Sequence, residues 1–214
     1  MTGPVRPLVA VLDYGIGNLR SAQKAFEHAG AEARLTADPT VIAQAHAVVL
    51  PGVGAFGACM DALRSAGLDG IAIDAALGAS AGGRPFLGIC VGMQMLYEGS
   101  AESPDHQGLG VLEGRLSLLP EGVKRPQMQW NRLEIDRPSA LFSTVDDPVW
   151  VYFVHSYAAD AAGADVVATC DYGGPVAAAV ERSNLWATQF HPEKSGGTGL
   201  QLLQAFVIAA QQGV

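Results

Sequence analysis

Residues 85–95 read Pro-Phe-Leu-Gly-Ile-Cys-Val-Gly-Met-Gln-Met. The apolar run 85–89 predicts a buried strand, and the residues after Cys90 predict a helix. Gly88 and Gly92 flank the cysteine in the pattern G-x-C-x-G, which is typical of a sharp strand-to-helix turn that carries a nucleophile. Such a turn raises the side chain at the carboxyl edge of a sheet, where open α/β sheets bind their ligands. This stretch therefore predicts an α/β fold with Cys90 as candidate nucleophile.

The alternation of strand and helix extends through the first half of the chain. Apolar runs at 8–12 and 47–50 predict two more buried strands, each followed by a glycine-rich turn and a stretch of helical periodicity. Residues 70–80 predict a further helix. Alternating strands and helices favour a mostly parallel central sheet flanked by helices.

The second half predicts short strands separated by Gly, Pro, Asp and Asn turns, and then one amphipathic helix. These strands are expected at 115–119, 130–135, 149–154, 166–169, 176–180 and 185–190. They predict a smaller antiparallel sheet attached to the central one. No repeat or long linker divides the chain, so we expect a single domain over residues 1–214.

The composition limits the classes of function. Apolar residues make up 49% and charged residues 16%, so the chain can bury a core and is not a disordered tail. The net charge of −8 and the lack of a basic stripe argue against nucleic-acid binding. No apolar stretch reaches membrane-spanning length, and the run at 8–12 is too short for a signal-peptide core, so we expect a cytoplasmic protein. The three cysteines form no CxxC pair, so neither a metal site nor a disulfide framework is predicted.

A nucleophilic cysteine needs a base, and only one of the five histidines has a carboxylate placed to orient it. This is His191, in the segment QFHPE at 189–193. Pro192 favours extended backbone at the residue before it, and residues two apart in an extended chain point to the same side. Glu193 can then hold one ring nitrogen while the other faces the Cys90 thiol, as in a catalytic triad. The alternative is a structural histidine at a strand end.

Two local features can stabilise negative charge at Cys90. The helix that follows points its positive end at the sulfur and favours the thiolate form. The backbone N–H of Val91 at that end is free to bind an oxyanion. The alternative is a buried cysteine that only fills space, which is the usual role of free cysteines and the one we assign to Cys59 and Cys170.

Six segments together resemble the class I (triad) glutamine amidotransferases. Within that family, they are similar to the glutaminase subunits of imidazole glycerol phosphate synthases, which act in histidine biosynthesis. The segments are DYGIGNL at 13–19, LPGVGAFG at 50–57, GICVGMQMLYEGS at 88–100, QWN at 129–131, VYFVHSY at 151–157 and QFHPEKSG at 189–196. They span nearly the whole chain, and their combination is highly specific.

The resemblance implies a triad of Cys90, His191 and Glu193 that forms a γ-glutamyl thioester, with no metal or organic cofactor. It also implies a set of residues that contact the substrate L-glutamine or complete the oxyanion hole. These are Gly52, Val53, Gly54, Val91, Gln94, Glu102, His155, Ser156 and Tyr157.

The resemblance further implies a partner protein. Subunits of this kind deliver ammonia to a separate (β/α)₈-barrel cyclase, so we expect a heterodimer with an ammonia channel. The residues expected near the interface are Asn18, Trp130, Asn131 and Lys194. One segment departs from the family: many members read PHMGWN where this chain has PQMQWN at 126–131, so Gln127 and Gln129 replace the commoner His and Gly.

Three alternatives stay open at the level of the residues. Another cysteine hydrolase on the same scaffold would share the turn at Cys90, but it would need neither HPE nor a glutamine pocket around Gln94. An amidotransferase subunit for anthranilate or aminodeoxychorismate would differ in its partner. A nucleotide-binding module is suggested by the two glycines at 15 and 17, but Arg20 stands where the fingerprint needs its third glycine.

Overall fold

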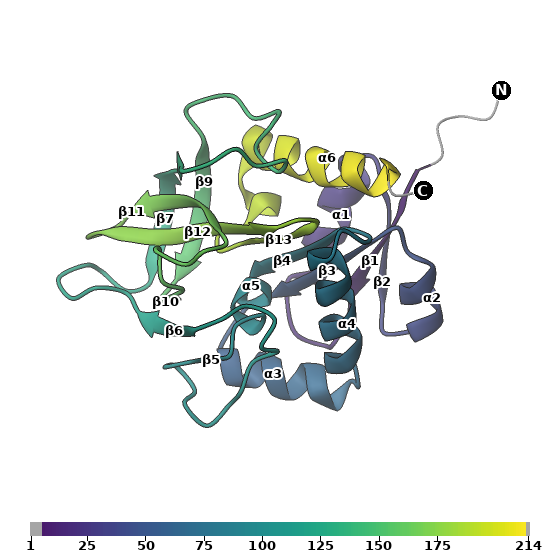
Figure 1. Cartoon of the computed structure of the whole chain (residues 1–214), viewed down its shortest axis with the longest axis horizontal. Coiled ribbons are helices and arrows are strands. Elements are labelled where there is room, and N and C mark those ends of the chain that lie inside the picture. Colours follow the sequence, from purple (N-terminus) through teal and green to yellow (C-terminus); the bar gives the residue numbers. More distant parts are fainter. Residues whose placement is uncertain (1–5, 213–214) are drawn as a thin grey trace.

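The computed structural model describes residues 6–212, and a central eight-stranded sheet organises them (Figure 1). In spatial order the strands are β2 (Glu32–Thr36), β1 (Leu8–Leu12), β3 (Ala47–Gly52), β4 (Phe86–Cys90), β13 (Leu185–Thr188), β12 (Pro175–Arg182), β11 (Val166–Asp171) and β8 (Glu134–Ile135). The first five are parallel, and each of the last three runs antiparallel to its neighbour. The predicted mostly parallel sheet is confirmed.

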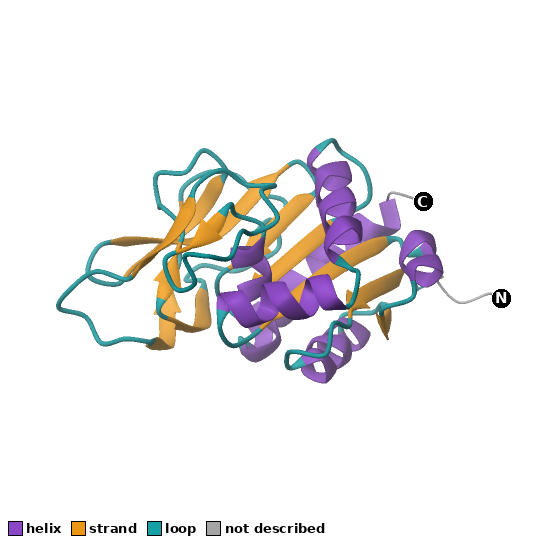
Figure 2. Ribbon diagram, turned by 90° about the horizontal axis from the view of Figure 1, so that it is seen from below, coloured by secondary structure: helices purple, strands orange, loops and turns teal. Residues whose placement is uncertain are grey.

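Helices cover both faces of the parallel strands (Figures 1 and 2). One face carries α1 (Leu19–His28) and α6 (Gly196–Gln212), and the other carries α3 (Phe56–Ser65) and α4 (Asp69–Ser80), while the short α2 (Pro39–Gln44) contacts β1. Every residue of β3 and β4 is buried, which explains why these strands are continuous apolar runs. On the first face, Phe206 of α6 packs against Phe26 and Trp186. None of the helices within residues 6–212 is long and apolar enough to cross a membrane.

Two small sheets complete the molecule and supply the predicted antiparallel part. In the first, β7 (Gln127–Arg132) pairs antiparallel with β9 (Trp150–His155). In the second, β6 (Arg115–Leu118) lies between β10 (Tyr157–Ala158) and β5 (Gly99–Ser100). The remaining elements, α5 (Val91–Met95) and η1 (Pro192–Lys194), follow β4 and β13 and carry the candidate site.

The structure differs from the sequence prediction in several places. The strand expected at 130–135 is two strands, β7 and β8, and β7 begins three residues earlier than expected. The strand expected at 185–190 ends at Thr188 and joins the central sheet parallel to β4. The edge strand β2 and the helix α2 were not predicted, because their five and six residues are too short and too polar to mark a clear period.

Candidate active site

Three neighbouring parallel strands end at the same edge of the central sheet. β3 and β4 are paired so that Gly52 lies beside Cys90, and β4 and β13 are paired so that Ile89 lies beside Thr188. The loop after Gly52, the turn at Cys90 and the QFHPE segment therefore emerge together, although about a hundred residues separate the last two in the sequence. This is the edge where open α/β sheets bind ligands.

The turn at Cys90 has the strained geometry that the sequence pattern predicts. Cys90 adopts φ 55° and ψ −110°, a conformation that costs a non-glycine residue roughly 1–3 kcal/mol. Gly92 permits the turn, because a Cβ there would lie 1.8 Å from the carbonyl oxygen of Leu50. The helix that follows has only five residues, so its dipole is smaller than the sequence suggested. Val91 is its first residue, whose backbone N–H has no acceptor within the helix.

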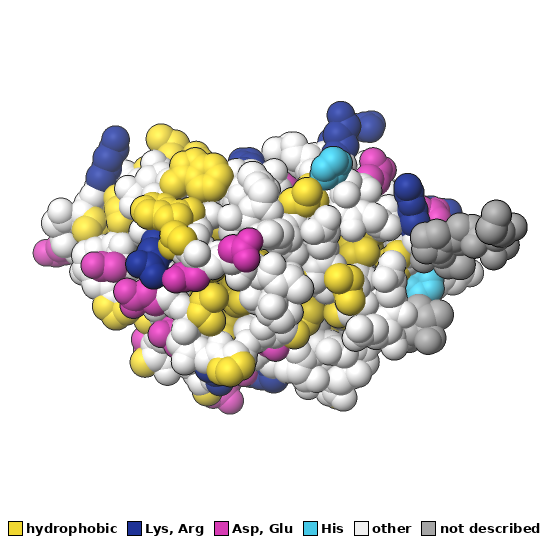
Figure 3. Space-filling view, turned by 90° about the horizontal axis from the view of Figure 1, so that it is seen from above, with side chains coloured by type: hydrophobic (Ala, Val, Ile, Leu, Met, Phe, Trp, Pro, Cys, Tyr) yellow, Lys and Arg dark blue, Asp and Glu magenta, His cyan; other side chains and the backbone are white. Residues whose placement is uncertain are grey.

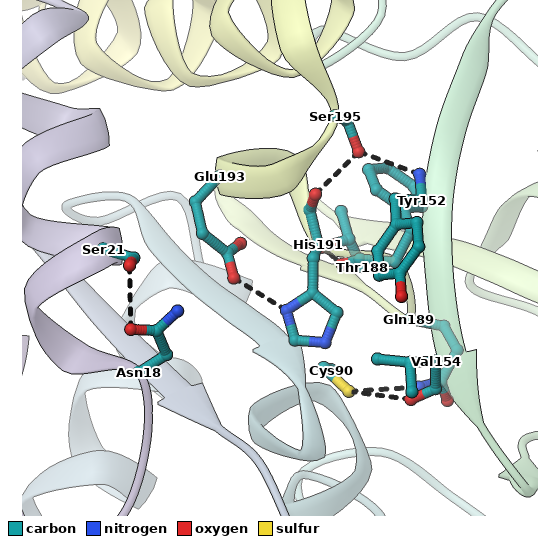
Figure 4. Close-up of polar contacts among 11 residues, drawn as sticks. Asn18, Ser21, Cys90, Tyr152, Val154, Thr188, Gln189, His191, Glu193 and Ser195 are labelled. Atoms are coloured by element: carbon teal, nitrogen blue, oxygen red, sulfur yellow. Dashed lines mark hydrogen bonds and ion pairs between the residues drawn. The ribbon is translucent and has the colours of Figure 1, made fainter. Parts of the chain in front are cut away.

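His191 and Glu193 form the arrangement expected from the HPE segment. The backbone of His191 is extended (φ −102°, ψ 96°), and its Nδ1 lies 2.7 Å from Oε1 of Glu193. Both side chains are almost fully buried, with 1% and 4% of their surface exposed. Figure 4 shows the imidazole between the carboxylate and the Cys90 sulfur, with Nε2 facing the sulfur. That nitrogen and Oε2 of Glu193 are the only buried side-chain polar atoms within residues 6–212 that make no hydrogen bond.

The surroundings of His191 favour its charged form. Burial lowers the pKa of His191, but the nearby Cys90 thiol and the Glu193 carboxylate raise it by more, to about 9. A protonated imidazole beside a sulfur favours the thiolate, which is the nucleophilic form of cysteine. The geometry and the charge therefore agree: a buried imidazolium is held by a carboxylate on one side and faces a sulfur on the other.

A cavity of about 390 Å³ opens in front of Cys90 and His191. It is lined by Asn18, Val53, Gly54, Cys90, Val91, Gln94, Glu102, Pro126, Val154, His155, Ser156, Tyr157, His191 and Lys194. All the residues predicted to contact the substrate line it except Gly52, which is buried below the loop. Glu193 lies behind His191 and does not reach it. The volume of the cavity is near the lower end for small-molecule sites, which suits a ligand the size of an amino acid.

Gln94 and Glu102 line the cavity and are held in place by different contacts. The side-chain nitrogen of Gln94 donates to the carbonyl oxygen of Tyr157 and to Oε1 of Gln189, both at 3.0 Å, which leaves its own oxygen for a ligand. Glu102 accepts a hydrogen bond of 2.8 Å from the backbone N–H of Phe56, the first residue of α3. The Glu102 carboxylate therefore lies at the N-terminus of α3, beside the cavity.

Two side chains that the sequence analysis missed hold the loop after β3. The hydroxyl of Tyr14 donates to the carbonyl oxygen of Pro51 at 2.6 Å, and the thiol of Cys59 donates to that of Val53 at 3.3 Å. Burial raises the pKa of both donors, so both keep their protons. Tyr14 stands in the DYGIGNL segment, where a signal was available, whereas nothing in the sequence separates Cys59 from a cysteine that only fills space.

His155 faces the cavity from β9 and is neutral. Burial lowers its pKa to about 4. Its Nδ1 lies 3.0 Å from the carbonyl oxygen of Tyr157 and its Nε2 lies 3.0 Å from Oε1 of Gln127, and a neutral ring donates its one N–H to one of these two oxygens. Gln127 is completely buried and also contacts the sulfur of Cys170 at 3.8 Å. Gln127, one of the two residues that depart from the family pattern, is therefore in contact with His155.

The residues expected at a partner interface lie at two kinds of position. Asn18 and Lys194 are exposed and line the cavity. Trp130 is 49% exposed on the outer face of β7, whereas Asn131 points to the opposite face and donates to the carbonyl oxygen of Asp171. The interface itself stays a prediction, but three of the four side chains are accessible to a partner.

Comparison with known proteins identifies the family. The sequence pattern of the family described as "Glutamine amidotransferase class-I" matches residues 10–210. The chain belongs to this family.

Its relatives within the family include two subunits named "Imidazole glycerol phosphate synthase subunit HisH". The one from Syntrophotalea carbinolica is 48% identical over 207 residues, which cover 93% of this chain and 98% of the relative. The one from Methanothermobacter thermautotrophicus is 48% identical over 200 residues, which cover 94% and 98%. Both likenesses extend over nearly the full length of each protein.

Solved structures share the fold at lower identity. A crystal structure described as a glutamine amidotransferase superposes with a TM-score of 0.71 at 21% identity and covers 95% of this chain and 98% of its own. PurLQS from Thermotoga maritima gives a TM-score of 0.70 at 20% identity with the same coverage. At these identities the likeness concerns the fold, and it confirms the predicted arrangement of sheets and helices.

Proposed function

We propose that this chain is the glutaminase subunit of an imidazole glycerol phosphate synthase, acting in histidine biosynthesis. It hydrolyses L-glutamine to glutamate and ammonia and supplies the ammonia to a cyclase subunit. The observation that carries the proposal is the position of His191 between Glu193 and the Cys90 sulfur, at the wall of a cavity of amino-acid size. The names of the relatives at 48% identity support the choice of this synthase.

The proposed reaction has two halves. The Cys90 thiolate attacks the side-chain amide carbon of glutamine, and the imidazolium of His191 protonates the departing nitrogen, which leaves as ammonia. The product on the enzyme is a γ-glutamyl thioester. His191, now neutral, takes a proton from a water molecule that attacks the thioester, and glutamate leaves with the thiolate restored. Glu193 holds Nδ1 throughout and keeps Nε2 aimed at the reacting atoms.

The other cavity residues have the chemistry that a bound glutamine needs. The free oxygen of Gln94 is placed to accept from the substrate ammonium, and the Glu102 carboxylate complements the same positive charge. The backbone N–H of Val91 and the glycine-rich 52–54 loop provide donors for the oxyanion that forms on the attacked carbonyl. No metal or organic cofactor has a part in this chemistry.

The proposed partner is a (β/α)₈-barrel cyclase that docks over the mouth of the cavity and forms a cytoplasmic heterodimer. Large apolar side chains are exposed on the outer face of the β7–β9 pair, which Figure 3 shows as hydrophobic groups gathered on the left of the view. They include Met128, Trp130 and Trp150, which are 60%, 49% and 45% exposed. Surface of this kind marks interaction sites. Lys194 is also exposed and lines the cavity. Ammonia released at Cys90 would enter the partner here.

The test is a glutaminase assay of the complex with its cyclase, combined with labelling of the thiols. Cys90→Ala should lower the rate of glutamate release by about 10⁶-fold, as loss of a nucleophile does in comparable triads. The glutamine-derived electrophile diazo-oxonorleucine should modify Cys90 alone. Cys59 and Cys170 are internal controls, because both are buried and burial raises the pKa of each, that of Cys170 to about 11. Activity in Cys90→Ala, or stimulation by a chorismate-binding synthase instead of the cyclase, would refute the proposal.

A further inference from the structure

Gln189 is a buried carboxamide that has no part in the reaction as described so far. It follows the last residue of β13 and stands two positions before His191. Its exposed fraction is zero, and it does not line the cavity. A buried amide is costly unless its donor and acceptor both find partners. Gln189 has two: its oxygen accepts from Gln94 at 3.0 Å, and its nitrogen lies 3.8 Å from the Cys90 sulfur.

The direction of these hydrogen bonds is fixed by the backbone. The carbonyl oxygen of Tyr157 can only accept, so the atom of Gln94 that faces it is the nitrogen. The second hydrogen of the same nitrogen points to Gln189, which must therefore turn its oxygen to Gln94. The amide nitrogen of Gln189 is then left facing the sulfur. Neither amide can rotate by half a turn without placing two donors or two acceptors against each other.

We propose that Gln189 is a positioning residue for the nucleophile, whose N–H donates to the Cys90 sulfur and holds the thiolate in line with His191. The proposal rests on the proposed function, since a thiolate at Cys90 matters only if the sulfur reacts. Figure 4 shows the Gln189 amide and the Val154 carbonyl on one side of the sulfur and the imidazole on the other. The sulfur is thus held from two sides.

The chemistry of the sulfur explains why a donor belongs there. Cys90 is 3% exposed, so a thiolate has little contact with solvent and needs hydrogen bonds from the protein. The Val154 carbonyl, 4.0 Å away, can only accept and offers nothing to a thiolate. Within the described part of the chain, the N–H of Gln189 is the side-chain donor that contacts the sulfur besides the imidazolium of His191, which faces it. Gln189 transfers no proton, because a carboxamide does not titrate.

Gln94 joins this contact to the cavity. One of its ends holds the Gln189 amide, and its free oxygen is the group proposed to bind the substrate. A ligand that fixes Gln94 therefore also fixes the donor at the sulfur. A series of contacts runs from Tyr157 through Gln94 and Gln189 to Cys90. Binding of a ligand in the cavity is thereby linked to the orientation of the Cys90 side chain.

The test uses two variants at one position and a matched control. Gln189→Met keeps the length of the side chain and removes its donor, while Gln189→Glu keeps the acceptor for Gln94 and replaces N–H by a charged oxygen. Gln23→Met is the control, because the Gln23 amide also donates to a backbone carbonyl, that of Ala33 at 3.0 Å, far from Cys90. The full-length proteins are alkylated with iodoacetamide from pH 5 to 10, and modification of Cys90 is followed by peptide mass spectrometry.

Gln189→Met should move the pH of half-maximal alkylation upward by about one unit, the value of one hydrogen bond to a charged group. In the complex with the cyclase, kcat should fall about tenfold while KM for glutamine stays within about threefold. Gln189→Glu should move the alkylation profile further in the same direction, because its carboxylate repels the thiolate. Gln23→Met should match the wild type.

The opposite result is equally clear. If folded Gln189 variants melt at a lower temperature but keep the wild-type alkylation profile, the amide is only a packing element and the proposal is overturned. If Gln189→Met does not fold, Gln189→Glu alone tests the proposal, because the glutamate side chain has the same shape as the native glutamine. Alkylation needs no glutamine, so a wild-type complex without glutaminase activity would refute the proposed function and leave this test standing.

Discussion

The two walls of the cavity each present a histidine, and the two histidines have opposite surroundings. His191, beside the central sheet, has a carboxylate on one nitrogen and nothing bonded to the other. His155, on the β7–β9 pair, has both nitrogens 3.0 Å from oxygen atoms of neutral groups, the backbone carbonyl of Tyr157 and the side-chain amide of Gln127. Both side chains are buried.

The comparison shows that burial alone does not set the charge of an imidazole, because a charged partner can outweigh it. Burial lowers the pKa of both histidines. At His155 nothing outweighs it, and the pKa falls to about 4. At His191 the Cys90 thiol and the Glu193 carboxylate outweigh it, and the pKa rises to about 9. Near neutral pH one wall of the cavity therefore carries a positive charge and the other carries none.

The walls also differ behind these side chains. The wall with His191 is backed by helices, and its strands are buried on both faces. The wall with His155 is a two-stranded sheet whose outer face exposes Trp130 and its neighbours. We infer that the wall with His191 carries out the reaction and that the wall with His155 binds the partner protein.

The strongest test of this comparison replaces the charged partner of His191 by a neutral amide, which is the kind of partner that His155 has. Glu193→Gln replaces the carboxylate by an amide of the same shape, so the imidazolium loses its counter-charge. We expect kcat for glutamine to fall by about 10³-fold or more, as in other triads whose carboxylate residue is replaced by an amide. The exposed Glu121→Gln is the control and should leave kcat unchanged. A loss below about tenfold would show that Glu193 does not tune the base.

A second experiment gives His155 the kind of partner that His191 has. The depressed pKa of His155 means that its contribution to stability is complete above pH 6.5 and is lost as the pH falls towards 4, by roughly 3 kcal/mol. In Gln127→Glu a carboxylate raises that pKa, and the loss between pH 7.5 and 5 should shrink or change sign. His155→Gln removes the titration and should make this part of the pH dependence disappear.

Urea-induced unfolding at the two pH values measures the effect, and taking the difference within each variant cancels any cost that does not depend on pH. The raised pKa of His191 has the opposite sign: its contribution is complete below pH 6.5 and is lost only as the pH rises through about 9. Part of it is already lost at pH 7.5, but this loss is the same in the wild type and in the two His155-wall variants, so it cancels when their pH dependences are compared. An unaltered pH dependence in Gln127→Glu would contradict the assignment of His155 as a neutral, buried histidine.

The wall with His191 was largely predictable from the sequence because its signals are local. The turn at Cys90 is set by glycines two residues away on each side, and the geometry of His191 by the proline and glutamate that follow it. What the sequence could not give is the pairing of β13 with β4, which brings the two segments together. The resemblance to a family supplied that step.

The wall with His155 was predicted less well, for a physical reason. The large apolar residues of β7 point outward, while Gln127 points into the protein, so the usual apolar-in pattern is inverted and the strand was placed three residues late. Gln189 was missed for a related reason. A polar residue at a strand end carries no sign of burial, and its two partners, Gln94 and Cys90, are about a hundred residues away in the sequence.

The last prediction concerns the outer face of the second wall. Trp130 packs its ring edge against Tyr152, with ring centroids 6.3 Å apart, and keeps 49% of its surface exposed. If a partner covers this face, Trp130→Ala should raise the Kd for the cyclase about 30-fold, the effect of losing a central aromatic contact. Leu77 on α4 has the same exposed fraction on the other side of the central sheet, so Leu77→Ala should leave the Kd unchanged. Equal effects of the two substitutions in a calorimetric titration would mean that the exposed tryptophan reflects general surface composition, and the division between a chemical wall and a docking wall would fail.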